Sequence, residues 1–482
     1  MSRARGVQQE VQRFLGIRPV QIAELELDGS GVLRPGPGSP PVTPGEVFVL
    51  VRSGGRPIGT LLGQVPEGAD PKSVLMDLAT RNHGAAQPAG AGRAGVGSGG
   101  SDGSGGTGAS GASGASGASG ASGASGASGA EPARRGHSAA GLARPPGPAH
   151  GPAPVPFTTV VIATRERAEK LVHALDSLLA QDHPDFEIVV VDNAPVTRAT
   201  RDLVERKYAE RVRYVTEPVP GLAVAHNKGV EAARGEVTAF TDDDVVADPR
   251  WLTELTAPFA ADPGLGCATG LILPARLGTP AQVLLESHGG FAKGFAARTY
   301  DPKDPPADEP LFPFTAGRFG SGANMAFRTE VLRAVGGFDP ATGAGTPARG
   351  GDDLYGFVRV LAEGHRLHYT PQALVWHHHR ETWRDLETQA YCYGAGLTAY
   401  LTAILVNRPS LLPAFLARLP RGLAHARTLT ASREAEADGA PGGHDDRSHA
   451  WPGRLSRLQR RGMLYGPVGY LRARRALRGA AR

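Results

Sequence analysis

Three consecutive aspartates, Asp242, Asp243 and Asp244, directly follow an apolar run in the middle of the sequence. Neighbouring carboxylates repel one another, which raises their pKa values unless a divalent cation compensates their charge. Carboxylate oxygens suit hard cations such as Mg²⁺ and Mn²⁺, and a Mg²⁺ held by one or two carboxylates usually completes its shell with substrate phosphates. The spacing of Asp242 and Asp244 therefore predicts a metal–diphosphate site, with a solvated turn as the alternative.

A second acidic pair, Asp352 and Asp353, follows a glycine-rich stretch and begins a helical pattern of apolar residues. Acids at a helix start commonly cap the helix and interact favourably with its dipole, so capping is the alternative to a chemical role. Three histidines at positions 377–379 end a later apolar run. A neutral histidine nitrogen can bind a metal, and we expect at most one of the three to do so.

Strand-like apolar runs alternate with helical patterns around these residues. Strands are predicted at Thr158–Thr164, Phe186–Asp192, Val212–Thr216, Glu236–Thr241 and Arg366–Trp376, and helices at Glu166–Ala180, Arg198–Ala209, Leu222–Ala233 and Pro249–Ala261. This order predicts an α/β fold with a Rossmann-like, mostly parallel sheet covered by helices on both faces. Ligands bind such sheets at the carboxyl ends of the strands, which is where Asp192 and the three aspartates fall.

A series of short motifs runs through this region in a fixed order. They are Thr159–Arg165, Val189–Asn193, Gly221–Gly229, Phe240–Asp244, Gly322–Arg328, Gly336–Asp339, Gly351–Leu354 and Val375–His377. Together they make residues 157–380, about half of the chain, resemble a family 2 glycosyltransferase with the GT-A fold. The resemblance implies transfer of a sugar from a nucleotide-diphosphate donor to an acceptor hydroxyl, with inversion and without a covalent intermediate, in glycan, cell-envelope or glycoconjugate biosynthesis.

The resemblance also implies a role for particular residues. Asp192 would accept a hydrogen bond from the base, for which we expect uracil and hence a UDP-sugar donor. The other predicted nucleotide-sugar contacts are Ala163, Thr164, Arg165, Asn193, His226, Asp242 and Asp243. Asp242, Asp244 and His377 would hold Mn²⁺ or Mg²⁺, and the cation would stabilise the departing diphosphate. Asp353 would be the general base with Asp352 beside it, and Gly322 and Asn324 would lie on the side of a carbohydrate or lipid-linked acceptor.

Two positions depart from the family pattern. His226 stands where the family usually has an arginine, and a histidine cannot copy the planar, permanently charged contact of a guanidinium at neutral pH. Asp352 stands where the family usually has a glutamate and is one methylene shorter. The first departure weakens the prediction of the donor, and the second leaves the predicted base, Asp353, in place.

Two other functions compete with glycosyl transfer. A nucleotidyltransferase needs a glycine-rich phosphate loop soon after the first strand, and residues 164–168 contain no glycine. A non-catalytic nucleotide-sugar-binding scaffold would have no need for Asp244, Asp353 and His377 together. Both alternatives are therefore less well supported than transfer.

Composition divides the 482 residues into further segments. Residues 1–84 predict a small β-rich accessory module, in which Glu46–Arg52 and Pro57–Val65 form a hairpin and Asp70 caps a helix that starts at Pro71. Residues 85–154 are rich in Gly, Ala, Ser and Pro, include seven Gly-Ala-Ser triplets, and predict a disordered linker. The catalytic domain would span 155–380, with helices packing on it at 381–430 and a polar loop and arginine-rich helix at 431–482.

The charge distribution indicates a partner for the C-terminus. Residues 451–482 contain nine arginines and no acid, so we expect peripheral contact with an anionic membrane, with a solvated helix face as the alternative. A nucleic-acid partner is not expected. The two cysteines exclude a disulfide framework, and neither a signal-peptide pattern nor an apolar run of membrane-spanning length is present. We therefore expect a cytoplasmic protein that can contact the inner face of the membrane.

Overall fold

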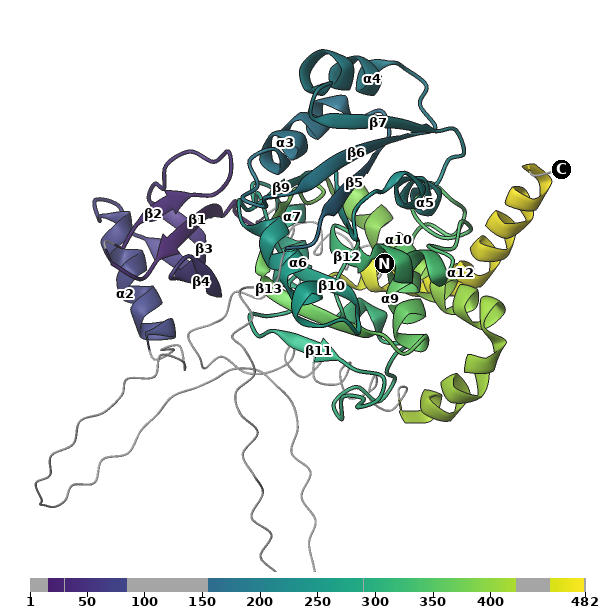
Figure 1. The fold of residues 1–482 in the computed structure, drawn as a ribbon. Coiled ribbons are helices and arrows are strands. Elements are labelled where there is room, and N and C mark those ends of the chain that lie inside the picture. The colour runs from purple at the N-terminus through teal and green to yellow at the C-terminus, as the bar shows by residue number, and fades with distance from the viewer. Residues whose placement is uncertain (1–15, 30, 85–154, 289, 422–450, 481–482) are drawn as a thin grey trace, which may run out of the picture. The chain divides into compact units, whose positions relative to one another are not determined.

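The computed structural model describes residues 16–29, 31–84, 155–288, 290–421 and 451–480 (Figure 1). The predicted linker at 85–154 and the loop that precedes residue 451 lie outside the described residues. Within the described residues the chain forms one nine-stranded sheet with helices on both faces and one smaller four-stranded sheet near the N-terminus.

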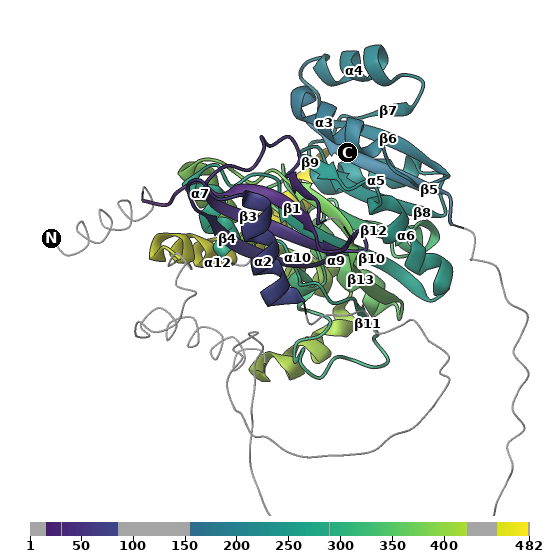
Figure 2. The same cartoon turned by 90° about the vertical axis from the view of Figure 1, so that its left-hand side faces the viewer.

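The large sheet contains all the strands predicted after residue 155. In the order of the chain, its strands are β5 (Thr158–Thr164), β6 (Phe186–Asn193), β7 (Val212–Glu217), β8 (Val237–Asp242), β9 (Val245–Ala247), β10 (Leu265–Pro274), β11 (Arg298–Tyr300), β12 (Asn324–Arg328) and β13 (Arg366–His377). Their order across the sheet is β11-β13-β10-β12-β8-β5-β6-β7, and Figure 2 shows it from bottom to top. Strands β5 to β8 are parallel, as predicted, whereas β12 runs antiparallel between β8 and β10.

Alternating side chains of the central strand face two helical layers. Val160 and Ile162 of β5 pack in one apolar cluster with helices α3 (Ala168–Leu178) and α6 (Trp251–Ala261). Val161, between them, packs in another cluster with helices α5 (Leu222–Ala232) and α9 (Asp352–Ala362). This period of two is the geometry of a strand that is buried on both faces, and it confirms the predicted α/β fold.

The remaining helices lie around the large sheet and in the C-terminal part. They are α4 (Ala199–Leu203), a π-helical turn (Val204–Tyr208), α7 (Pro280–Ser287), two 3₁₀ turns (Ala316–Arg318 and Pro409–Leu411), α8 (Thr329–Ala334), α10 (Trp383–Asn407), a helical segment at 412–421 and α12 (Gly453–Ala480). Among the described residues, no single helix has the length and apolar character of a membrane span. The pair formed by α10 and the following segment to Arg421 reaches them only jointly, across a bend of 109°.

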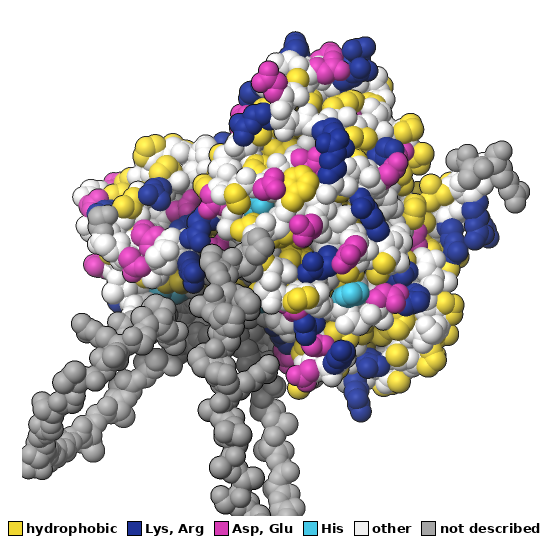
Figure 3. All heavy atoms as spheres, in the orientation of Figure 1, with side chains coloured by type: hydrophobic (Ala, Val, Ile, Leu, Met, Phe, Trp, Pro, Cys, Tyr) yellow, Lys and Arg dark blue, Asp and Glu magenta, His cyan; other side chains and the backbone are white. Residues whose placement is uncertain are grey.

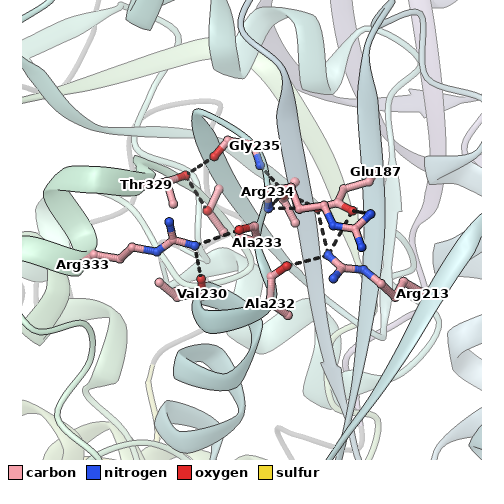
Figure 4. Close-up of polar contacts among 11 residues, drawn as sticks. Glu187, Arg213, Val230, Ala232, Ala233, Arg234, Gly235, Thr329 and Arg333 are labelled. Atoms are coloured by element: carbon pink, nitrogen blue, oxygen red, sulfur yellow. Dashed lines mark hydrogen bonds and ion pairs between the residues drawn. The ribbon is translucent and has the colours of Figure 1, made fainter.

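A polar network closes the amino ends of the strands, away from the aspartates (Figure 4). Arg333 donates to the carbonyls of Val230 and Ala233, each at 2.8 Å, near the end of α5. Arg213 donates to the Ala232 carbonyl at 2.6 Å and to both oxygens of Glu187. Because the last carbonyls of a helix have no partner within the helix, these arginines fix the connection from α5 to β8.

The N-terminal module has the predicted β-rich structure. Its sheet has the order β2-β1-β3-β4, with strands β1 (Gln21–Glu26), β2 (Leu33–Pro35), β3 (Gly45–Ser53) and β4 (Arg56–Val65), and helix α2 (Pro71–His83) follows. Strands β3 and β4 form the predicted hairpin. The Asp70 side chain accepts from the Ser73 backbone N–H at 3.0 Å, which is the predicted cap.

This module shares a core with the large sheet. Ile22 and Leu50 belong to the same buried apolar cluster as Leu271 of β10 and Trp376 of β13. Arg52 bridges the two parts as well, because its guanidinium lies 2.7 Å from Glu24 and 2.6 Å from Asp248, just after β9. The module therefore packs against β13, the strand that ends at the predicted metal ligand His377.

Candidate functional site

The three predicted metal ligands lie together at the carboxyl edge of the sheet. Asp242 ends β8, Asp244 follows in the turn to β9, and His377 ends β13. Because β9 pairs with β13 in the register Val245 to His377, the turn that carries Asp244 is held beside the histidine. One ligand atom from each of the three side chains lies within 4.8 Å of the others, and His377 Nε2 is 3.4 Å from Asp244 Oδ1.

The electrostatics of this group suit a divalent cation. Burial, and then the neighbouring carboxylates of Asp244 and Asp243, raise the pKa of Asp242 well above its usual value. Burial lowers the pKa of His377 to about 3, so its ring is neutral at pH 7 and can offer a nitrogen lone pair. Two carboxylates and a neutral imidazole within reach of one point form a donor set that Mn²⁺ or Mg²⁺ accepts.

The middle aspartate has a different position from its two neighbours. Asp243 is buried and accepts from the Thr164 hydroxyl at 2.7 Å and from Arg167. The same Arg167 guanidinium donates to Asp244 Oδ2 at 2.8 Å. Asp243 therefore connects the turn after β8 to the loop after β5 through both of its oxygens, while the nucleotide-sugar contact predicted for it stays a prediction.

A cavity of about 270 Å³ opens beside these residues. It brings together most of the predicted donor-site residues, namely Ala163, Thr164, Arg165, Asn193, Asp242, Asp243, Asp244 and His377, and adds Leu222, Ala344, Gly345, Arg167 and Arg380. Sequence reasoning missed both Arg167 and Arg380. Arg167 stands just after the β5 motif, and Arg380 stands just after the three histidines. These positions could have indicated both residues, because a cation at either position would face a diphosphate.

Asp192 and Asn193, at the end of β6, have distinct roles in the structure. Asp192 Oδ2 accepts from the Tyr214 hydroxyl at 2.8 Å, whereas Oδ1 is buried and has no hydrogen-bond partner among the described residues. The Asn193 amide donates to the Val219 carbonyl at 2.7 Å and accepts from the Gly221 N–H at 2.9 Å. Asp192 thus keeps one oxygen for a ligand, while Asn193 fixes the loop before α5.

The second acidic pair begins α9, as predicted. Gly351 adopts a left-handed φ of 89° before the helix, a conformation that favours glycine. Asp353 accepts from the backbone N–H of Gly322 and of Leu354, both at 2.8 Å. Burial, and then the charge of Asp352, raise the pKa of Asp353 to about 6. A carboxylate with this pKa is ionised at neutral pH and still binds a proton readily.

His226 and Asn324 lie away from the cavity. His226 is buried between the rings of Phe240 and Phe338, and its Nδ1 is 3.1 Å from Asp352 Oδ2. Asn324, predicted on the acceptor side, accepts from the Trp251 indole N–H at 2.9 Å and donates to two backbone carbonyls in the core. Gly322, in contrast, lies directly against Asp353, because a Cβ at this position would be 3.3 Å from that of the aspartate.

Known proteins are similar in sequence to about half of this chain. A pre-mycofactocin glycosyltransferase of Mycobacterium tuberculosis is 28% identical over 254 residues, which cover 52% of this chain and 48% of that protein. A glucosyl-dolichyl phosphate glucuronosyltransferase of Haloferax volcanii is 25% identical over 235 residues, covering 45% of this chain and 68% of that protein. The chain thus spans about half the length of the mycobacterial relative and about two thirds of the archaeal one.

A solved structure and a family model complete the comparison. A mannosyltransferase from Pyrobaculum calidifontis, solved with GDP-Man and Mn²⁺, aligns with a TM-score of 0.42 and 20% identity over 66% of this chain and 88% of its own. The model of glycosyl transferase family 2 matches residues 159–336, which contain β5 to β8, the three aspartates and Gly322. Residues 159–336 of this chain are therefore similar to glycosyl transferase family 2.

Proposed function

We propose that this protein transfers a sugar from a nucleoside-diphosphate sugar to an acceptor hydroxyl in a metal-dependent reaction with inversion. The observation that carries the proposal is the position of two acidic groups at one edge of the sheet. A Cβ at Gly343 would lie 3.3 Å from the carboxyl carbon of Asp352, and the residues after Gly343, Ala344 and Gly345, line the cavity together with Asp242. A site for the diphosphate and a site for a proton acceptor therefore adjoin, as a single displacement at the anomeric carbon requires.

The chain's own residues would act as follows. Asp353 accepts the proton of the acceptor hydroxyl while that oxygen forms a bond to the anomeric carbon. The bond from this carbon to the diphosphate breaks on the opposite side, and the nucleoside diphosphate leaves with the electron pair. Arg167 orients Asp244, and Arg380 faces the same cavity. When bound at Asp242, Asp244 and His377, Mn²⁺ or Mg²⁺ supplies positive charge for the departing diphosphate.

We propose a uracil base for the donor. Only one oxygen of Asp192 is unpaired among the described residues, because Tyr214 occupies the other. Uracil presents a single ring N–H to such a group, whereas guanine presents two adjacent donors that suit a carboxylate with both oxygens free. Asp192 is 1% exposed, so a base that reaches it must displace neighbouring side chains.

The acceptor we propose is a carbohydrate, either free or linked to a lipid, in glycan or cell-envelope synthesis. The Haloferax volcanii relative, a glucosyl-dolichyl phosphate glucuronosyltransferase, supports the lipid-linked form.

Donor binding and turnover test the proposal separately. A panel of UDP-, GDP- and dTDP-sugars is screened by thermal shift with Mn²⁺, because a ligand that binds only the native state raises its stability. The best donor is then incubated with candidate acceptors, and nucleoside diphosphate release is measured with and without acceptor. Acceptor-dependent release and a product of inverted configuration are expected. Binding of a donor without any release would favour a non-catalytic scaffold.

A further inference from the structure

Helix α12 is fixed along α10 by glycines on one of its faces. A Cβ at Gly462 would lie 2.1 Å from the Tyr391 carbonyl oxygen, and one at Gly466 would lie 2.3 Å from that of Ala395. From α10, a Cβ at Gly394 would lie 1.9 Å from the Gln459 carbonyl oxygen. Backbones that approach this closely leave no freedom for α12 to rotate, so its other face is presented in a fixed orientation.

The opposite face of α12 combines exposed apolar and basic side chains. Leu464 is 81% exposed, and Val468 and Leu471 are each 46% exposed, with the four- and three-residue spacing of one helical face. At 100° per residue, five arginines lie within about 60° of Leu464, and Arg457, Arg461 and Arg475 are three of them. Figure 3 shows basic and apolar side chains along the end of α12, at the right. We call these six residues the α12 face.

The α12 face has no acidic counterpart. Residues 451–482 contain no Asp or Glu, and the three arginines of the α12 face have no acidic partner among the described residues. Of the twelve exposed large apolar side chains in the described residues, eight lie between Tyr393 and Leu471, and four of these eight lie in α12. Apolar exposure is therefore concentrated in the same C-terminal helices as the unpaired positive charge.

We propose that the α12 face docks on the surface of an anionic membrane. Arginines attract acidic lipid headgroups, and the three apolar side chains between them insert into the headgroup–acyl boundary. A nucleic-acid backbone would also attract the arginines, but it would leave Leu464, Val468 and Leu471 in water, so the combination favours lipid.

The packing of α10 links this face to the acidic pair. Gly351, directly before Asp352, packs against α10, since a Cβ at Gly351 would lie 2.5 Å from the Gly396 carbonyl oxygen. One helix therefore separates the α12 face from the start of α9. This part of the inference rests on the proposed function: an acceptor held in the membrane by its lipid would be presented close to Asp353.

Vesicle binding by the full-length protein tests the docking. Co-sedimentation is measured with phosphatidylcholine vesicles and with vesicles that contain about one third phosphatidylglycerol. Three triple variants are compared with the parent, namely Arg457→Gln/Arg461→Gln/Arg475→Gln, Leu464→Ser/Val468→Ser/Leu471→Ser, and a control with Arg198→Gln/Arg206→Gln/Arg211→Gln in a distant, exposed segment. All substituted side chains are exposed, so unchanged thermal midpoints are expected.

The parent and the control should bind the anionic vesicles in a salt-sensitive way and bind phosphatidylcholine weakly. The arginine variant should lose about 100-fold in affinity, as three near-surface charges imply, and the apolar variant at least about 10-fold. Equal binding by the parent and both α12 variants would overturn the proposal. A different result would favour a nucleic-acid surface and overturn the proposal: duplex RNA binds the parent but not the arginine variant, and vesicles bind the parent and the apolar variant equally.

Discussion

His226 Nδ1 lies 3.1 Å from Asp352 Oδ2, and both side chains are buried beside the predicted base Asp353. His226 is also the position at which the sequence departs from the family pattern. An arginine is longer and permanently charged, whereas the histidine ring fits between Phe240 and Phe338. The side chain that was predicted to contact the nucleotide therefore lies against the acidic pair.

Removing this histidine should change the pH dependence of transfer. His226 lowers the pKa of Asp353, which burial and Asp352 raise to about 6. A base works only when it is deprotonated, so kcat/KM of the parent should fall as the pH drops through about 6. His226→Gln keeps a hydrogen-bonding side chain but removes the imidazole that lowers the pKa of Asp353, so the fall of kcat/KM at acidic pH should begin at a higher pH. The same substitution at exposed His173 should leave the limb in place, and an unmoved limb in His226→Gln would refute the coupling.

Substitutions of Asp244 and Asp243 should have different effects, because we expect the first to be a metal ligand and the second a structural residue. Asp244→Asn should abolish the stabilisation that Mn²⁺ gives in the presence of UDP, because the amide lacks the charge that attracts the cation. Asp243→Asn should instead lower the thermal midpoint without Mn²⁺, because it weakens the bonds to Thr164 and Arg167. Differential scanning fluorimetry with and without Mn²⁺ measures both effects. Equal Mn²⁺ responses in the parent and Asp244→Asn would contradict the assignment.

The N-terminal module should contribute to the stability of the catalytic region. Leu50 is fully buried in the cluster that contains Leu271 and Trp376, so Leu50→Ala should destabilise the whole protein by about 2–5 kcal/mol. Leu62→Ala, on the same module but 41% exposed, should change stability by less than about 0.5 kcal/mol. Urea unfolding followed by tryptophan fluorescence measures both. If Leu50→Ala shifts only a separate, early transition, the module folds independently and the shared core is unimportant.

Much of the fold follows from local sequence. Buried strands such as β5 and β8 consist mainly of apolar residues and threonine, and the Asp70–Pro71 start of α2 is a local signal. The grouping of the metal ligands could be predicted from the sequence because the carboxyl ends of parallel strands lie at one edge of the sheet. The antiparallel strand β12 could not be predicted from the sequence, since the position of this five-residue strand depends on long-range pairing with β8 and β10.

The parts of the site that sequence reasoning missed depend on tertiary contacts. Arg167 reaches Asp243 and Asp244 from a segment about 76 residues away, and its position just after the β5 motif does not by itself reveal these two contacts. Asn324 lies in a motif that suggests an acceptor role, yet its amide bonds to Trp251 and two core carbonyls. The boundaries of the linker and the role of each site residue remain predictions.

Turnover and donor binding of Asp353→Asn provide the most direct test of the proposed mechanism. Asparagine keeps the size of the side chain but lacks the basic carboxylate, and the donor contacts that we propose lie elsewhere, at Asp192, Asp242 and Asp244. The parent, Asp353→Asn and Asp352→Asn are compared by titration calorimetry with the donor and Mn²⁺ and by single-turnover transfer. Donor affinity should be retained in all three, while transfer falls by about 10²–10⁴-fold in Asp353→Asn and less in Asp352→Asn. A variant Asp353→Asn that transfers at the parent rate but melts at a lower temperature would show that Asp353 only caps α9, and the mechanism would be wrong.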